Sequence, residues 1–356
     1  MDHINTFKSK RVLVTGDTGF KGSWLCAWLN KLGAHVYGFA LPPVDDKCNF
    51  NLCKLKNHIK HIDGDVRTDS LERFVKATMP EYIFHLAAQP IVLESYKDPK
   101  YTLETNIMGT VNLLSAAMNI DCLKSIVVVT SDKCYRNSGE VMDESFPLGG
   151  DDPYSASKAC EDLVATSFYK SFFKDKSVGL STARAGNVIG GGDRGADRIV
   201  PDCIRAIENG DNIELRNPAY TRPWQYVLEP LYGYLKLSAL MSESPGRYSD
   251  AWNFGPKLED HVPVSELAEI ILVNAQALKN KVGSHINIGS SGSSEREKIN
   301  LRINSSKADK LLGVRNALGI QDVGRYIVED YFCEGDVLEQ RCDRIDQYME
   351  KGKNGM

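Results

Sequence analysis

Two pairs of ionisable residues near the middle of the sequence could transfer protons. Asp132 and Lys133 follow Ser131, directly after a run of apolar residues that is typical of a buried strand. Tyr154 and Lys158 are four residues apart, and this spacing places both on one face of a helix. A nearby ammonium lowers the pKa of a phenol from about 10, so that the phenolate can accept a proton from an alcohol. The sequence therefore predicts chemistry on a hydroxyl group, although the first pair could also form a turn with a single ion pair.

The first half of the chain alternates short β-branched segments with helical patterns. We expect strands at Arg11–Thr15, His35–Ala40, Tyr82–Leu86, Ser125–Thr130 and Val178–Arg184. We expect helices at Gly19–Leu32, Asp69–Thr78, Tyr101–Asn119 and Pro153–Phe173. Nearly continuous apolar strands separated by helices indicate a parallel sheet covered on both faces. The residues Ser131, Asp132 and Lys133 would then lie at the carboxyl edge of the sheet, where α/β proteins bind their ligands.

The chain changes character after Ala185. The segment GNVIGGGDRGADR is rich in glycine and charge and predicts a loop. Shorter helices and brief strands follow it, with helices expected at Ile199–Asn209, Val264–Gln276 and Gln321–Phe332. We therefore predict a Rossmann-type, doubly wound α/β domain in residues 1–185, to which the chain returns near 227–245. Residues 186–356 would mainly form a smaller C-terminal α/β lobe that binds the substrate.

Three glycines join the first expected strand to the first expected helix. Gly16, Gly19 and Gly22 lie in the segment GDTGFKG. Glycines allow a sharp turn, and they let backbone N–H groups at a helix N-terminus approach a pyrophosphate. A glycine triplet alone is weak evidence, but its place at the first strand–helix junction of an alternating chain predicts a dinucleotide site.

Composition and charge exclude several classes of protein. The chain has 356 residues and a formal net charge of −4, so its electrostatics give no reason to expect a nucleic-acid or membrane partner. No apolar run approaches the roughly 18 residues of a membrane-spanning helix. The nine cysteines include no C-x-x-C pair, which argues against a zinc site or a disulfide framework and favours reduced thiols. We expect a cytoplasmic protein without a metal.

The motifs resemble those of a known enzyme family. The G-x-x-G-x-x-G spacing is similar to that of the extended short-chain dehydrogenase/reductases. The segments GDTGFKGSWL, TSDKCY, PYSASKAC, ARAGNVIGGGD, DRIVPD and RPWQYVLEPL resemble the CDP-glucose 4,6-dehydratases. The similarity extends from about Arg11 to Leu240 and is weaker beyond, where KADKLLG is similar to the closing motif of that family. The resemblance implies an NAD-dependent hydro-lyase of deoxysugar biosynthesis, including O-antigen and other polysaccharides.

The resemblance also implies which residues hold NAD. These are Gly16, Thr18, Gly19, Phe20, Gly22, Asp65, Val66, Leu86, Ala87, Ala88, Gln89, Tyr154 and Lys158. One expected feature is missing, because the second strand ends in Gly38–Leu41 without the acid that usually holds the ribose 2′-hydroxyl of NAD. No basic clamp for a 2′-phosphate is evident either. On physical grounds alone, the choice between NAD and NADP stays open.

The family's chemistry gives the proton-transfer residues separate roles. Tyr154, assisted by Lys158 and Ser131, would deprotonate the glucose 4-hydroxyl. Lys133 would remove the C5 proton, and Asp132 would protonate the departing 6-hydroxyl. The residues expected to bind the diphosphate and nucleotide are Asn187, Arg198, Arg222, Trp224 and Gln225. The substrate would be CDP-glucose and the product CDP-4-keto-6-deoxyglucose.

Two departures from the family pattern leave other readings open. Asp17 stands in the glycine loop where histidine is usual, and would add negative charge near the pyrophosphate. Tyr226 also replaces a histidine and could alter the fit of the substrate. Alternatives are a 4,6-dehydratase of a related nucleotide sugar, a nucleotide-sugar epimerase, and a dinucleotide sensor without catalysis. Family members are usually homodimers or homotetramers, with contacts through the helices expected at Tyr101–Asn119 and Pro153–Phe173.

Overall fold

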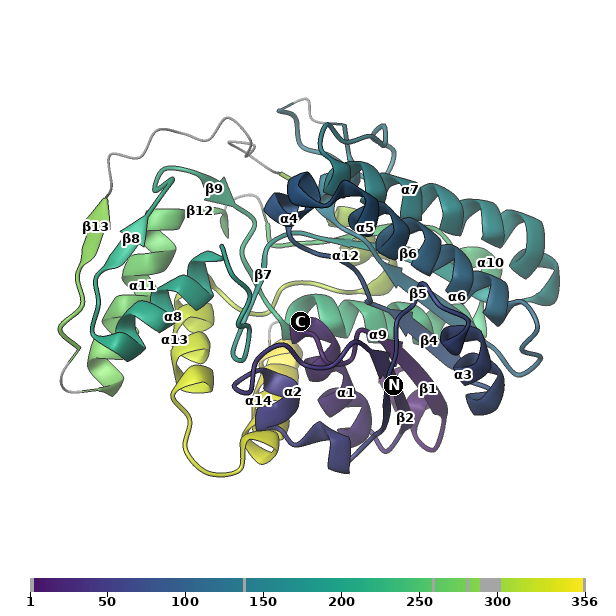
Figure 1. Cartoon of the computed structure of the whole chain (residues 1–356), viewed down its shortest axis with the longest axis horizontal. Coiled ribbons are helices and arrows are strands. Elements are labelled where there is room, and N and C mark those ends of the chain that lie inside the picture. Colours follow the sequence, from purple (N-terminus) through teal and green to yellow (C-terminus); the bar gives the residue numbers. More distant parts are fainter. Residues whose placement is uncertain (1–2, 137–138, 258–259, 280–281, 289–301, 355–356) are drawn as a thin grey trace.

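The core of the molecule is a seven-stranded, wholly parallel sheet in a computed structural model that describes residues 3–136, 139–257, 260–279, 282–288 and 302–354. The strand order is β11-β6-β5-β4-β1-β2-β3 (Figure 1). Their bounds are β1 (Arg11–Thr15), β2 (His35–Ala40), β3 (Lys60–Asp63), β4 (Tyr82–His85), β5 (Ser125–Val129), β6 (Gly179–Ala185) and β11 (Ala251–Phe254). The predicted Rossmann-type fold class is confirmed.

Helices cover both faces of this sheet because successive strand residues point to opposite sides. In β1, Val12 and Val14 belong to one apolar cluster and Leu13 to the other. The first cluster includes α1 (Phe20–Lys31) and α9 (Leu228–Glu243), and the second includes α3 (Ser70–Thr78), α6 (Gly109–Ala117) and α7 (Pro153–Phe168). Between these helices in the chain lie shorter ones: α2 (Asn49–Leu52), α4 (Val92–Lys97) and α5 (Pro99–Leu103).

Two of the predicted helices are interrupted. The helix expected at Tyr101–Asn119 consists of α5, a π-helical turn at Glu104–Met108 and α6. The helix expected at Pro153–Phe173 ends its α-helical part at Phe168 and continues as a π-helical turn. The apolar periodicity of both segments continues through these turns, so the sequence pattern does not mark them.

A smaller lobe lies beside the carboxyl edge of the sheet (Figure 1). Its helices are α8 (Ile199–Asn209), α11 (Val264–Leu278) and α13 (Ile320–Tyr331). Its strands form pairs: β8 (Ile213–Leu215) with β13 (Ile286–Ile288), and β9 (Thr221–Arg222) with β12 (Val262–Pro263). A third pair, β7 (Val188–Ile189) with β10 (Gln225–Tyr226), lies partly in the segment that we expect to be a loop, so that expectation is wrong for two residues.

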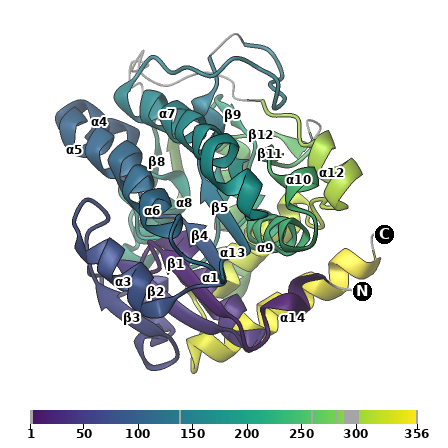
Figure 2. The same cartoon turned by 90° about the vertical axis from the view of Figure 1, so that its right-hand side faces the viewer.

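The chain crosses between the lobes more than once. After β10 it returns through α9, α10 (Pro245–Tyr248) and β11, which pairs with β6 at one edge of the large sheet. The segment α12 (Ser306–Leu312) follows. The last helix, α14 (Val337–Asn354), lies against α1 (Figure 2), where Lys31 Nζ is 2.8 Å from Asp346 Oδ2. Within the described part of the chain, no helix has the length and apolar character needed to span a bilayer.

Candidate active site

Strand β5 ends directly before the first pair of proton-transfer residues. Asp132–Cys134 form a single 3₁₀ turn, and Ser131 is its N-cap. The Ser131 hydroxyl accepts a hydrogen bond from Lys133 N at 3.2 Å and donates to Asp132 Oδ1 at 3.0 Å. The acid and the amine therefore stand side by side because the chain folds back in one tight turn at the carboxyl edge of the sheet.

Helix α7 brings the second pair to the same place. Its N-cap Asp152 accepts a hydrogen bond from Ser155 N at 2.9 Å, and Pro153 occupies the first turn, where its missing N–H costs nothing. Tyr154 thus lies in the first turn and is buried. Lys133 Nζ is 6.0 Å from the centre of its ring. The structure therefore brings together the two pairs that the sequence identifies.

Burial controls the protonation of Tyr154. It raises the pKa of the phenol, while the ammonium of Lys158 and a hydrogen bond with Ser131 oppose this rise without cancelling it. Burial alone would lower the pKa of Lys158, but Glu161 and Tyr154 outweigh it and hold the ammonium in its charged form. The phenol therefore needs additional positive charge, such as a bound oxidised nicotinamide supplies, to ionise near neutral pH.

Two charged groups at this site are absent from the sequence prediction. Glu161 is buried beside Lys158, and its carboxylate oxygen lies 2.9 Å from Lys158 Nζ. Burial raises the pKa of Glu161 to about 7, against the opposing charge of Lys158. Lys21 follows Phe20 in the glycine loop, and burial with repulsion from Lys158 and Arg198 lowers its pKa to about 7. The signal for Lys21 in the sequence is its place between Gly19 and Gly22.

The Asp132 carboxyl is well suited to donate a proton. Burial raises its pKa, although Lys133, Ser131 and Arg222 pull it down. Among the described residues, its Oδ2 has no hydrogen-bond partner. A buried carboxyl oxygen without a partner is costly unless it is protonated or a ligand completes it. Asp132 is therefore a candidate general acid.

The glycine loop has the shape that a dinucleotide requires. Gly16 has a φ of +75°, and a Cβ added there would lie 2.7 Å from Ala87 N. A Cβ at Gly22 would lie 2.1 Å from Gly16 O, so loop and helix touch without room for a side chain. Gly19 caps α1 without a side-chain hydrogen bond, which leaves first-turn N–H groups for an anion. The three glycines and the first turn of α1 fit the pyrophosphate of NAD. This glycine cradle is therefore the candidate cofactor site.

The other predicted cofactor residues keep that role as a prediction, and several make local contacts. Thr18 Oγ1 donates to Leu41 O at 2.8 Å, and Gln89 Nε2 donates to Thr102 Oγ1 at 2.8 Å. The Asp65 carboxylate accepts from Arg67, which lowers the pKa of Asp65. Among the remaining ones, Phe20 opens α1, Val66 is buried, and Leu86, Ala87 and Ala88 follow β4.

Asp17 does not extend towards the pyrophosphate position, contrary to our expectation. Its side chain is 0% exposed, and Oδ2 lies 2.7 Å from Nδ1 of His61 on β3. Gly38 on β2 makes room for it, because a Cβ there would lie 2.0 Å from Asp17 Oδ2. Burial raises the pKa of Asp17, while His61 opposes this. The carboxylate of Asp17 therefore packs against the neighbouring strands β2 and β3 of the sheet.

The predicted substrate residues follow β6 in the chain, and the structure gives the contacts that each of them makes. Arg198 Nη1 lies 3.0 and 2.9 Å from the two carboxylate oxygens of Asp193, and Arg222 acts on the pKa of Asp132 through its charge. Trp224 Nε1 donates to Val262 O at 3.0 Å, and Gln225 Nε2 donates to Phe254 O at 2.9 Å. Gln225 N donates to the carbonyl of Asn187. Roles for all five in substrate binding stay predictions.

Tyr226 lies in the interior of the protein, and its effect on the fit of the substrate stays a prediction. It is fully buried, and its hydroxyl donates to Asp330 Oδ2 at 2.5 Å. Its ring packs edge-on against Trp24 and Tyr326, with ring centroids 6.2 and 5.6 Å away. The residue joins α13 to α1.

The fold and the paired side chains define a short-chain dehydrogenase/reductase with an added acid/base pair. The family model for GDP-mannose 4,6 dehydratase matches residues 13–326. A CDP-glucose 4,6-dehydratase of Salmonella typhimurium is 41% identical over 332 residues, which are 91% of each chain. The chain belongs to the nucleotide-sugar 4,6-dehydratase family, and the resemblance seen in its motifs is confirmed.

More distant relatives share part of the sequence or the fold. A dTDP-D-glucose 4,6-dehydratase of Dictyostelium discoideum is 29% identical over 61% of this chain and 53% of its own. The epimerase Mth375 of Methanothermobacter thermautotrophicus superposes with a TM-score of 0.77 at 21% identity, covering 98% and 97% of the two chains. The dTDP-glucose 4,6-dehydratase DesIV of Streptomyces venezuelae, solved as a double mutant with NAD and DAU bound, gives 0.72 at 22%, covering 90% and 96%. At such identities the superpositions show the fold.

Proposed function

We propose that this chain is an NAD-dependent CDP-glucose 4,6-dehydratase that converts CDP-D-glucose to CDP-4-keto-6-deoxy-D-glucose with loss of water. The observation that carries the proposal is the pair Asp132 and Lys133 beside Tyr154 at one buried site, in a chain 41% identical to a CDP-glucose 4,6-dehydratase. An alcohol oxidation alone needs only the tyrosine and its lysine. The additional acid and amine are what an elimination requires.

The first step takes place at C4 of the sugar. The Tyr154 phenolate accepts the proton of the 4-hydroxyl while Ser131 holds the same oxygen. Lys158 keeps its positive charge through Glu161 and stabilises the phenolate. Bound NAD⁺ supplies the redox chemistry, accepting a hydride from C4 and returning it to C6. The glycine cradle would hold the pyrophosphate of the cofactor at the carboxyl edge of the sheet, the edge at which Tyr154 lies.

The second step removes water across C5 and C6. Once C4 is a ketone, the C5 proton is acidic and the Lys133 amine removes it. The Asp132 carboxyl, whose pKa burial raises, gives its proton to the departing 6-hydroxyl. Water then leaves, and the double bond is ready to be reduced at C6. Asp132 and Lys133 are adjacent in the chain. The charge of each affects the protonation of the other, so their titrations are coupled.

The diphosphate would lie between arginines of the smaller lobe. Arg198 is held by Asp193 and Arg222 is buried near Asp132, so both guanidinium groups are fixed before the substrate arrives. Guanidinium groups bind phosphate oxygens in a bidentate manner. Asn187 and the segment Trp224–Gln225 would complete the nucleotide side of the pocket.

We also propose a homo-oligomer that assembles through α5, α6, α7 and the π-helical turns that adjoin them. Four large apolar side chains are 37–58% exposed on these segments: Leu103, Met108, Leu163 and Phe172. Exposed apolar side chains gathered on neighbouring helices are typical of a subunit contact.

All nine cysteines are free thiols, which supports a reducing compartment such as the cytoplasm.

A substrate comparison tests the proposed function. Purified protein is mixed separately with CDP-, UDP-, GDP- and dTDP-linked glucose or mannose, and the base-induced absorbance of a 4-keto-6-deoxy sugar is recorded. We expect the highest kcat/KM for CDP-glucose, without net release of reduced cofactor. A 4-epimer as the product would show an epimerase instead, and equal kcat/KM for another nucleotide would refute the assignment of cytidine.

A further inference from the structure

A chain of buried polar residues runs behind the proton-transfer site without reaching the substrate. It consists of Asp162 on α7, Arg184 on β6, Tyr135 after the catalytic turn, and Asn253 on β11, and we call it the polar bracket. Each of the four is nearly inaccessible to solvent. Groups of this kind are costly to bury unless every one is hydrogen-bonded, so their arrangement has one well-defined geometry.

One end of the polar bracket fastens the catalytic helix to the sheet. Asp162 Oδ1 accepts from Arg184 Nη2 at 2.8 Å and Nε at 3.1 Å, and also from the hydroxyl of Thr182. Asp162 Oδ2 accepts from Thr130 Oγ1 at 2.9 Å. Asp162 follows Lys158 by one helical turn, and Thr130 immediately precedes Ser131. This end therefore fixes the distance between α7 and the start of the catalytic turn.

The other end fastens the residue that closes the catalytic turn. The Tyr135 hydroxyl accepts from Arg184 Nη1 at 2.8 Å and donates to Asn253 Oδ1 at 2.6 Å. Asn253 Nδ2 donates to the carbonyls of Met142 and Asn304, at 3.2 and 3.1 Å. The Tyr135 ring also lies 4.8 Å from the guanidinium of Arg184. The hydroxyl of Tyr135 therefore uses both its donor and its acceptor.

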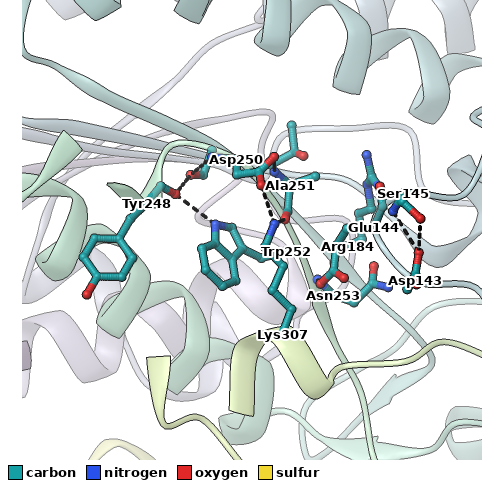
Figure 3. A network of polar contacts seen from close by, with 12 residues as sticks. Asp143, Glu144, Ser145, Arg184, Tyr248, Asp250, Ala251, Trp252, Asn253 and Lys307 are labelled. Atoms are coloured by element: carbon teal, nitrogen blue, oxygen red, sulfur yellow. Dashed lines mark hydrogen bonds and ion pairs between the residues drawn. The ribbon is translucent and has the colours of Figure 1, made fainter. Parts of the chain in front are cut away.

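Figure 3 shows the Asn253 end, where Arg184 and Glu144 lie beside Asn253. Glu144 Oε1 accepts from Asn253 N at 2.8 Å, and Arg184 Nη1 lies 3.4 Å from the Glu144 carbonyl. At the start of β11, Lys307 forms an ion pair with Asp250 and donates to the carbonyl of Ala251. Strand β11, an edge strand, is thus anchored by side chains from segments far away in the sequence.

The catalytic turn lies between these two fastenings. Thr130 precedes it and Tyr135 follows it, so Asp132 and Lys133 are held from both sides. Inside the turn the bonds are local, such as those from Ser131 Oγ to its two neighbours. Tyr154 is fixed by the N-cap of α7, and the Asp162 end of the polar bracket holds that helix to Thr130, next to Ser131, without the Tyr135 hydroxyl. The Tyr135 end holds the other side of the turn, two residues after Lys133.

We propose that Tyr135 is a positioning residue for the elimination step: through Arg184 and Asn253 it holds Asp132 and Lys133 in register with the sugar, while C4 oxidation proceeds without it. The inference rests on the proposed function and adds a residue that touches neither substrate nor cofactor. Misplacement of a reacting group by about 1 Å can cost about 100-fold in rate, so a small loosening of the turn is measurable.

Single-turnover kinetics of Tyr135→Phe test the proposal. The variant keeps the ring and loses the hydroxyl. With CDP-glucose, the reduced-cofactor absorbance should rise within about twofold of the wild-type rate and then decay about 10-fold more slowly or worse. The matched control is Tyr82→Phe, which removes another buried hydroxyl, one that lies 3.4 Å from Thr6 on the amino side of the sheet. It should leave both phases unchanged.

A second measurement needs no substrate. Reductive ¹³C-methylation labels lysine amines for NMR, and Lys133→Arg assigns the Lys133 signal. Tyr135→Phe should shift or broaden this signal, whereas Tyr82→Phe should not. Equal slowing of both kinetic phases, or a Lys133 signal that Tyr135→Phe leaves unchanged, overturns the proposal. If wild-type protein fails to convert CDP-glucose while Tyr135→Phe still moves the Lys133 signal, the proposed function is wrong, and only the support that Tyr135 gives to the turn stands.

Discussion

Lys158 and Glu161 form a buried ion pair, with Nζ 2.9 Å from a carboxylate oxygen. They are three residues apart on α7, and their side chains are 4% and 2% exposed. Lys158 stabilises the Tyr154 phenolate, whereas the carboxylate of Glu161 destabilises it. Glu161 therefore has two opposing effects. It keeps Lys158 charged, and it weakens the stabilisation that Lys158 gives to the Tyr154 phenolate.

Glu161→Gln should make the phenol more acidic. Removing the carboxylate lowers the pKa of Tyr154, so the rising limb of the pH profile for C4 oxidation should move to lower pH. Burial raises the pKa of Glu161 to about 7, so the carboxylate is charged above that pH and the difference from wild type should be largest there. Single-turnover formation of reduced cofactor, measured against pH, checks this.

Glu94→Gln is the matched control, because Glu94 also pairs with a lysine three residues later but on an exposed helix surface. Its profile should coincide with that of the wild type. A Glu161→Gln profile that moves to higher pH would show that the lysine has lost its charge, and would contradict the role assigned to the pair.

Most of the large sheet could be predicted because its strands carry strong local signals. β1 and β2 begin and end where the apolar runs do. β3 is a polar edge strand whose sequence, KHID, has no buried run. β11 follows α9 and α10 in the chain, and contacts with residues distant in the sequence, such as Glu144, accompany its pairing with β6. Long-range pairing of this kind leaves no local pattern.

The candidate site shows the same division. Tyr154, Lys158 and the turn after β5 could be found from their spacing and from their place at the ends of elements. The orientation of Asp17 could not, since it depends on the absence of a side chain at Gly38 on a neighbouring strand. Glu161 was invisible for a similar reason: a glutamate one turn from a lysine is usually an exposed pair.

Glu229→Gln should change how stability depends on pH. Burial raises the pKa of Glu229 to about 8, from an ordinary 4.5. The folded state therefore binds this proton more tightly than the unfolded state, and the free energy of unfolding falls as the pH rises from about 4.5 to about 8. Glutamine can keep the bonds to Leu318 N and Tyr348 without titrating. Relative to wild type, the variant should gain stability across this range.

Urea unfolding at a series of pH values measures the effect, which should reach a few kcal/mol at about pH 8. Glu243→Gln, at the exposed end of the same helix, is the control and should follow the wild type. A difference between Glu229→Gln and wild type that stays constant from pH 5 to about 8 would mean that Glu229 does not titrate in this range.

Gly38→Ala should destabilise the nucleotide end of the sheet. The new Cβ would lie 2.0 Å from Asp17 Oδ2, so the carboxylate and His61 must move. Overpacking of this kind costs about 1–3 kcal/mol. Because Asp17 follows Gly16 in the cradle, the affinity for NAD should also fall, which a fluorescence titration measures. Gly246→Ala places a Cβ in open space and should change neither quantity.

Lys133→Ala separates the two chemical steps most directly. A lysine acts as a base only when neutral, and its ordinary pKa is about 10.4, so the site must favour the amine. Asp132 contributes if it is protonated, and burial raises its pKa in that direction. Without the amine, Tyr154 still oxidises C4 but no group removes the C5 proton. Reduced cofactor should accumulate on the enzyme, and little dehydrated product should form.

Solvent deuterium provides a second criterion for the same variant. Wild-type protein in D₂O should place deuterium at C5 of the product, and substrate recovered from Lys133→Ala should contain none. Lys100→Ala is the control, since Lys100 lies on an exposed helix surface where it pairs with Glu104, and it should behave as wild type. Turnover of Lys133→Ala near the wild-type rate would mean that another group is the base.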